Sequence, residues 1–227
     1  MREIVLDTET TGFKAEDGHR IIEIGCVELF NHLPTGGRYH QYINPEREVP
    51  ADAVKVHGLT AAFLAPYPKF AEIARAFLDF MGDAPLVAHN AQFDTNFLNA
   101  ELKRLGLPPI THNRQVVDTI PMARRKFPGA QASLDALCRR FGIDNSNRSQ
   151  HGALIDASLL AEVYLELLGG RQTGLALESA AVLDTIPARA RNSRTPRPPR
   201  VYPVAAEEIA AHTALLKKLQ NPLWLMS

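Results

Sequence analysis

Two carboxylates spaced two residues apart follow a short apolar run near the N-terminus, in the segment Asp7-Thr8-Glu9 after Ile4-Val5-Leu6. Residues two apart in an extended strand point to the same side, so Asp7 and Glu9 are predicted to converge where a buried strand ends. Like charges held close together repel unless a proton or a cation lies between them. A divalent metal ion bound by both carboxylates would remove this repulsion most simply.

Three more residues with acid-base or metal-binding chemistry lie where predicted strands end or predicted helices begin. Asp94 follows a short apolar strand, and His151 and Asp156 lie at the start of a long helix. Each has a local alternative: Asp94 complementing a helix dipole, His151 capping a helix, and Asp156 facing water. The accumulation of four acids and a histidine at such positions favours one common site.

Carboxylate oxygens suit hard cations such as Mg²⁺ or Mn²⁺. Two such ions about 4 Å apart stabilise both the attacking and the leaving oxygen of a phosphoryl displacement. A histidine titrates near neutral pH, so His151 is a candidate to accept the proton of the attacking water. The residue set therefore predicts metal-dependent hydrolysis of a phosphodiester.

The elements that must position these groups alternate between strands and helices. Short apolar strands are predicted at residues 2–7, 20–30, 39–44, 86–88 and 116–117. Apolar residues at helical spacing predict helices at residues 70–81, 92–105, 134–141 and 153–168. Short connections make the first three strands an antiparallel meander, and the rest is a strand-helix-strand alternation, which indicates an α/β fold.

Composition bounds the class of protein. The chain has 227 residues, 45% of them apolar, enough for one large domain with an appendage. Twenty-five basic residues balance twenty-five acidic ones, so nucleic-acid binding would need local basic patches or metal-bridged phosphates. Cys26 and Cys138 lack zinc-site spacing and are expected to be reduced core residues. With no apolar leader or membrane-length apolar run, a soluble cytoplasmic protein is expected.

The sequence changes character after the double glycine at residues 169–170. Residues 185–206 contain five arginines, five prolines and no acid, which predicts a disordered linker. A helix is predicted at residues 205–220. The expected organisation is a catalytic domain at 1–170, a linker at 171–204 and a C-terminal binding segment at 205–227.

The motifs Asp-x-Glu-Thr-Thr-Gly, His-Asn-x-x-Phe-Asp and His-x-x-x-x-Asp together resemble the three exonuclease motifs of the DEDDh family. The resemblance implies an RNase H-like fold, a central mixed five-stranded sheet flanked by helices, with a flexible C-terminal tail. It also implies that Asp7, Glu9 and Asp156 ligate one metal ion, that Asp7 and Asp94 bind a second, and that His151 is the general base.

Residues 52–60 resemble the family's loop that touches the 3′-terminal nucleotide. This implies nucleotide contacts by Asp52 and His57, beside Asp7, Glu9 and Asp156. The alternative is that Asp52 starts a short helix and His57 is a solvated loop residue.

Within the family, residues 127–129, 133–138 and 161–165 resemble the proofreading subunits of bacterial DNA polymerase III. The implied activity is 3′-to-5′ removal of mispaired terminal nucleotides as 5′-monophosphates from single-stranded or frayed DNA. An RNA-trimming enzyme of the same superfamily and a catalytically silent scaffold are the alternatives. An RNA-trimming enzyme has no evident need for the C-terminal tail, which argues against that alternative. The complete set of acids argues against a silent scaffold.

Two tail segments resemble docking elements of those proofreading subunits. Residues 172–177 resemble a motif for the beta sliding clamp, with Gln172, Leu175 and Leu177 as contacts. The end of the chain resembles the segment that binds the polymerase alpha subunit, with contacts from Ile209, Leu216, Leu219 and Trp224. The alternatives are an ordinary linker and a tryptophan packed on its own domain. A small accessory subunit on the catalytic domain is left open.

Overall fold

The computed structural model describes residues 1–112, 114–146, 151–170 and 204–218. Contacts divide the chain into one unit at Met1–Gly174 and another at Leu175–Ser227. In the second unit, the described residues contain one helix, α8 (Ala206–Leu216). The expected clamp-docking residues 172–177, together with Leu219 and Trp224, lie outside the described residues, and the three-part domain organisation stays a prediction.

One mixed sheet forms the centre of the first unit, with strand order β3-β2-β1-β4-β5. Its strands are β1 (Arg2–Thr10), β2 (Ile21–Phe30), β3 (Leu33–Tyr42), β4 (Leu86–Ala88) and β5 (Val116–Asp118). The first three pair antiparallel, as a meander requires, whereas β1, β4 and β5 run parallel. The expected central five-stranded mixed sheet is confirmed.

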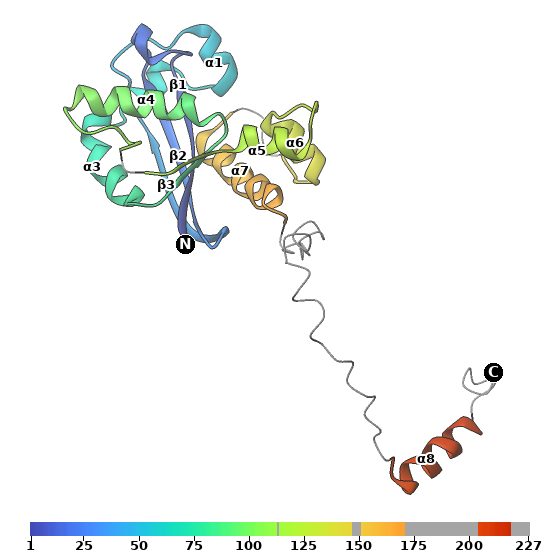
Figure 1. The fold of residues 1–227 in the computed structure, drawn as a ribbon. Coiled ribbons are helices and arrows are strands. Elements are labelled where there is room, and N and C mark those ends of the chain that lie inside the picture. Colours follow the sequence, from blue (N-terminus) through green and yellow to red (C-terminus); the bar gives the residue numbers. More distant parts are fainter. Residues whose placement is uncertain (113, 147–150, 171–203, 219–227) are drawn as a thin grey trace, which may run out of the picture. The chain divides into compact units, whose positions relative to one another are not determined.

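Helices cover both faces of this sheet (Figure 1). On one face lie α3 (Phe70–Met81) and α4 (Ala91–Arg104); on the other lie α5 (Thr119–Lys126), α6 (Leu134–Phe141) and α7 (Ala153–Leu167). Alternation along β1 supplies both layers, because Ile4 and Leu6 join the core under α3 and α4 while Val5 joins the core under α7.

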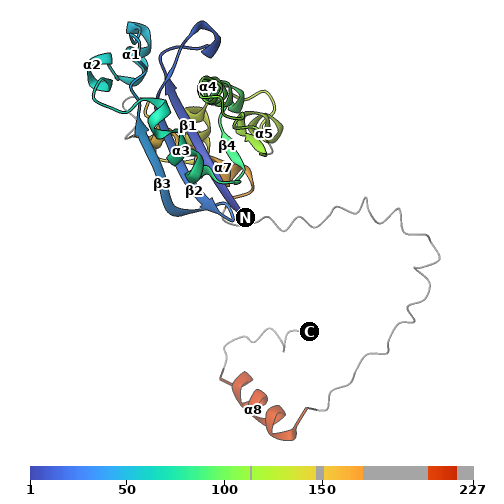
Figure 2. The same ribbon diagram turned by 90° about the vertical axis from the view of Figure 1, so that its left-hand side faces the viewer.

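Short helices lie at one end of the sheet. They are the 3₁₀ turn η1 (Ala15–Asp17) after β1, and α1 (Ala51–His57) and α2 (Ala61–Leu64) after β3 (Figure 2). Thr60 caps α2, since its hydroxyl accepts a hydrogen bond from the Phe63 N–H. These segments surround the end of β1 that carries the acids.

Several element boundaries differ from the sequence prediction. β1 does not end at Asp7 but continues to Thr10, because β2 pairs with it as far as Thr10, across a bulge between Glu9 and Thr10. The acids instead follow the end of the parallel pairing with β4, which reaches only Val5. β3 starts at Leu33 and not at Tyr39, since its first half is an exposed edge strand without an apolar period. Helix α5 was not predicted.

Candidate active site

Asp7 and Glu9 lie on the face of β1 that α7 covers, and the residue between them faces the opposite layer. Thr8 is buried there, and its Oγ1 donates a hydrogen bond to Asp94 Oδ1 at 2.7 Å. Strand alternation thus directs two acids to α7 and uses the intervening threonine to hold the acid from α4. Thr8 therefore has a function in the site that was not predicted from the sequence.

A second unpredicted residue, Asp118, fixes where α4 begins. It ends β5, and its carboxylate accepts hydrogen bonds from the N–H groups of Asn90 and Ala91, each at 3.2 Å. The same carboxylate caps α5 through the Ile120 N–H at 2.9 Å. An aspartate just before a Thr-Ile-Pro segment is a helix-start signal that could have revealed the cap, although not its second role.

Asp94, on the first turn of α4, is 2% exposed. Burial raises the pKa of this carboxyl to about 7, against the lowering effect of the Thr8 hydrogen bond, and the Asp118 carboxylate raises it further. An ionised Asp94 therefore needs positive charge beside it. A bound cation supplies that charge, so burial of this acid fits a metal site.

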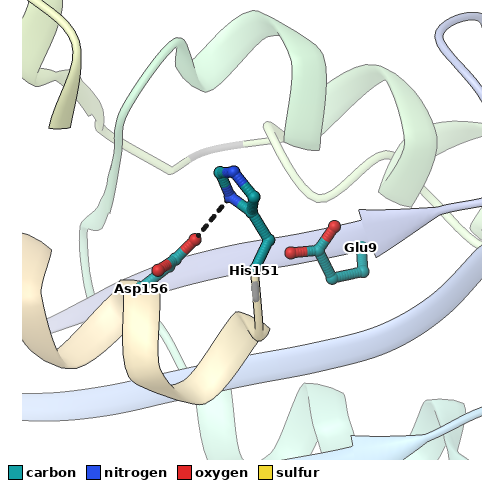
Figure 3. A group of neighbouring side chains, drawn as sticks. All are labelled: Glu9, His151 and Asp156. Carbon is teal, nitrogen blue, oxygen red and sulfur yellow. Dashed lines mark hydrogen bonds and ion pairs between the residues drawn. The ribbon is translucent and has the colours of Figure 1, made fainter. Parts of the chain in front are cut away.

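Glu9, His151 and Asp156 form a group of possible metal ligands (Figure 3). One oxygen from each carboxylate and one ring nitrogen lie within 4.8 Å of one another. His151 Nδ1 is 3.2 Å from Asp156 Oδ2, and the histidine side chain is 45% exposed whereas the aspartate is 4% exposed. A buried acid and a solvent-accessible base thus meet at the start of α7.

The His151 backbone is attached to a different element. Its N–H donates to the carbonyl oxygen of Val56, in α1, at 3.3 Å. Because His151 precedes α7 and does not belong to it, this bond helps to set where the imidazole lies.

All five predicted catalytic residues line one cavity of about 440 Å³, together with Asp135. With His89, seven ionisable side chains line this space, and no lysine or arginine is among its described lining residues. Five of these side chains are carboxylates, and carboxylate oxygens are the ligands that hard divalent cations prefer. The residues present fit a metal centre.

Glu23 lies directly opposite Glu9 in the pairing of β1 with β2, so two like charges are cross-strand neighbours. Glu23 is 3% exposed, and its Oε1 is 2.7 Å from His40 Nε2. His40 thus gives Glu23 a hydrogen-bond partner where the two acids lie opposite each other. Neither Glu23 nor His40 was singled out from the sequence, because the pairing register decides this contact.

An adjoining cavity, also of about 440 Å³, contains the two residues predicted to touch the terminal nucleotide, and Glu9 lines it too. His57 is 4% exposed and not solvated, and its Nδ1 accepts the Leu59 N–H at 3.0 Å. Burial lowers the pKa of His57, an effect opposed by Glu23 and reinforced by His151. The neutral ring therefore carries its proton on Nε2. Asp52 is exposed and lies 2.9 Å from Lys55 Nζ.

Gly25 allows α7 to approach the sheet. It lies opposite Asp7, and a Cβ added there would come within 2.2 Å of backbone atoms of Ala153 and Leu154. We expect Gly25→Ala to displace the first turn of α7 and so move Asp156. The predicted melting temperature is lower by several degrees, because each kcal/mol lost from the free energy of unfolding lowers it by about 2–4 °C in a chain of this size. The predicted kcat is at least about tenfold lower.

Gly152→Ala is the matched control, because a Cβ there meets nothing nearer than Ile155 Cδ1 at 3.8 Å. Thermal unfolding and nucleotide release measured on both variants test the prediction. Wild-type stability and activity in Gly25→Ala would show that α7 does not depend on this close approach.

The predicted polymerase-binding residues are only partly described. Ile209 is 55% exposed on α8, and Leu216 ends that helix. Within the part of the chain that the structure describes, no helix has the length and apolar character needed to cross a membrane.

Solved structures with a similar architecture include nucleases. The nuclease domain of 3′hExo, described as a DEDDh family member bound to rAMP, has a TM-score of 0.64 and 22% identity over 74% of this chain and 91% of that one. Exonuclease X in complex with 5′ overhanging duplex DNA has a TM-score of 0.58 and 24% identity, over 73% and 90%. These likenesses concern the fold and confirm the RNase H-like architecture.

The sheet and its carboxylate cluster define a metal-dependent 3′–5′ exonuclease. Residues 4–164 match the family model described as Exonuclease. DNA polymerase III subunit epsilon of Rickettsia conorii is 46% identical over 222 residues, 96% of each chain, and that of Escherichia coli K12 is 45% identical over 229 residues, 97% of this chain and 94% of that one. The chain therefore belongs to the exonuclease family, in the group of DNA polymerase III epsilon subunits.

Proposed function

We propose that this chain is the proofreading subunit of a cytoplasmic bacterial replicase and removes mispaired 3′-terminal nucleotides from frayed DNA as 5′-monophosphates. The observation that carries the proposal is the convergence of Glu9, His151 and Asp156 in one cavity with Asp7 and Asp94. Relatives named epsilon subunits match it over almost their whole length. A mispaired end separates more readily, so it reaches a single-strand site more often.

Two Mg²⁺ or Mn²⁺ ions are proposed, with Asp7, Glu9 and Asp156 as ligands of one, and Asp7 with Asp94 as ligands of the other. When bound, such ions act as Lewis acids that stabilise the attacking and leaving oxygens. The chain's own contribution is to direct carboxylates from β1, α4 and α7 into one space.

His151 is proposed as the general base. An Nδ1–H that donates to Asp156 Oδ2 at 3.2 Å leaves Nε2 as the nitrogen that accepts a proton from water. The neighbouring carboxylate then stabilises the imidazolium that forms. Removal of the proton as water attacks is the step that this arrangement performs.

The terminal nucleotide is proposed to occupy the cavity lined by Asp52 and His57. Because the Leu59 N–H fixes the tautomer, His57 Nε2–H is a donor, and it has no hydrogen-bond partner among the described residues. A buried donor of this kind favours an oxygen-rich ligand such as a sugar or a phosphate. Exposed Asp52 would contact the nucleotide only at the cavity's edge.

The partners are proposed to be the polymerase alpha subunit and the beta sliding clamp. Alpha would bind α8 and the residues after it, through Ile209, Leu216, Leu219 and Trp224, whereas the clamp would bind Gln172, Leu175 and Leu177.

Deletion of residues 205–227 is expected to abolish association with the alpha subunit and to preserve hydrolysis of short oligonucleotides. The reason is that the site's described residues all lie in the first unit. Co-elution with alpha and nucleotide release measure the two effects. Undiminished co-elution would mean that the polymerase binds elsewhere.

One assay tests the proposed function directly. Nucleotide release from matched and mismatched primer ends and from an RNA oligomer is compared, with Mg²⁺ or with chelator, and with or without the alpha subunit. Faster, metal-dependent release from mismatched DNA is expected. Faster release from RNA would favour the RNA-trimming alternative, and no release from any substrate would favour the scaffold.

A further inference from the structure

A third cavity lies between α4 and the segment that follows β1. Its volume, about 750 Å³, exceeds that of either cavity described above. Lys14 lines it from the segment after β1, and Asn96, Lys103 and Arg104 line it from α4. We call this cavity the α4 groove.

The α4 groove adjoins the catalytic region. It shares Phe13 and Phe93 with the cavity that contains His57, and it shares Phe93 with the carboxylate cavity. A strand with its last nucleotide in the first cavity and its scissile phosphate in the second must continue over the neighbouring surface. The α4 groove is that surface on the side of Phe93.

The charge of the α4 groove suits a polyanion. Three cations, Lys14, Lys103 and Arg104, line it against the single acid Glu16. The whole chain has a formal net charge of zero, so this local excess is not a consequence of overall composition. The carboxylate cavity beside it contains no described lysine or arginine, and the two surfaces therefore differ in sign.

Arg104 is also held in place by a buried acid on its own helix. Its Nη1 is 3.1 Å from Glu101 Oε1, and Glu101 is 2% exposed. Arg20 binds the same carboxylate through two hydrogen bonds, at 2.6 and 2.9 Å. Glu101, itself held by Arg20, thus positions the Arg104 guanidinium at the groove without requiring a ligand to order it.

We propose that the α4 groove binds the phosphates of the single DNA strand upstream of its terminal nucleotide. The inference rests on the proposed function and adds to it a defined path for the strand. Lys14, Lys103 and Arg104 make phosphate contacts, which set affinity and do not depend on base sequence. Affinity accordingly rises with strand length until the groove is filled.

The test compares two substrates of the full-length chain. One is the p-nitrophenyl ester of thymidine 5′-monophosphate, which has no upstream nucleotides; the other is an oligothymidylate of about eight nucleotides, long enough for a single-strand site. In the double variant Lys14→Ala, Lys103→Ala, the ratio of oligonucleotide to ester kcat/KM is expected to fall about tenfold. The double variant loses two phosphate contacts, and each contributes about 0.7 to the slope of log KM against the logarithm of the salt concentration. For the oligonucleotide, this slope should therefore decrease by about 1.4.

Lys103→Glu and Arg75→Glu provide a matched pair, because both change the net charge equally. Arg75 is exposed on α3 and lines none of the three cavities. The substrate ratio should fall only in Lys103→Glu. An equal fall of the ratio in both variants, or no fall in the double variant, would refute DNA binding by the α4 groove. Either result would leave the proposed exonuclease function intact. Failure of the wild type to hydrolyse either substrate would instead refute the proposed function.

Discussion

Replacement of His151 by alanine is expected to lower kcat by about 10²- to 10⁴-fold, the usual range for loss of a general base. Metal affinity should change by less than about threefold, or roughly 0.65 kcal/mol. The reason is that Glu9 and Asp156 still supply their carboxylates after the imidazole is removed, whereas the attacking water loses its proton acceptor.

The measurement must separate these effects, because the geometry also permits a different role. A ring nitrogen of His151 lies within 4.8 Å of both carboxylates, close enough to be considered as a ligand itself. Nucleotide release gives kcat, and calorimetric titration with Mn²⁺ gives metal affinity. His112→Ala, at an exposed histidine that lines none of the three cavities, is the control. Parallel loss of metal affinity and turnover would make His151 a ligand.

Asp94→Asn is expected to lower the rate of hydrolysis by more than about 10³-fold, because one metal ion is lost. The same substitution is expected to stabilise the metal-free protein. Asparagine keeps the shape of the side chain, and its oxygen can still accept the hydrogen bond from Thr8. It removes a buried charge. The melting temperature in chelator at pH 8 should therefore rise by several degrees, at about 2–4 °C per kcal/mol.

The pH dependence of this stability difference follows from the direction in which the pKa of Asp94 is shifted. Burial raises the pKa of Asp94 in the folded state to about 7, above its ordinary value of 3.8. The folded state consequently binds this proton more tightly than the unfolded state does, so the contribution of Asp94 becomes less favourable as pH rises from about 4 to about 7. The advantage of Asp94→Asn in chelator should grow across that interval and then level off.

Added Mg²⁺ should reverse the order, because a ligand that binds only the folded state stabilises the wild type more than the variant. Asp79→Asn, at an exposed position on α3, controls for loss of a negative charge. A lower melting temperature for Asp94→Asn in chelator at pH 8 would show that its carboxylate stabilises the metal-free fold.

The central part of this fold could be predicted because local patterns determine it. The run Ile4-Val5-Leu6 supplies both cores by alternation, and two acids directly after such a run are costly to hold together without a cation. Helix starts likewise placed Asp94 and Asp156 near the sheet. Motif spacing was informative because each acid is close in sequence to the element that positions it.

The features that could not be predicted depend on contacts between distant segments. Asp118 joins β5 to the start of α4, and Glu23 meets Glu9 only in the observed register. The need for glycine at position 25 exists only because α7 crosses β2 there. No local pattern encodes such pairings, and the extension of β1 to Thr10 has the same origin in its partner strand.

The bond between the His151 N–H and the Val56 carbonyl connects the proposed base to the helix that carries Asp52 and His57. We therefore expect a shift of α1 to move the imidazole as well. Displacement of a catalytic group by about 1 Å can change the rate about 10²-fold. We therefore expect an end that fits α1 poorly to be hydrolysed slowly as well as bound weakly.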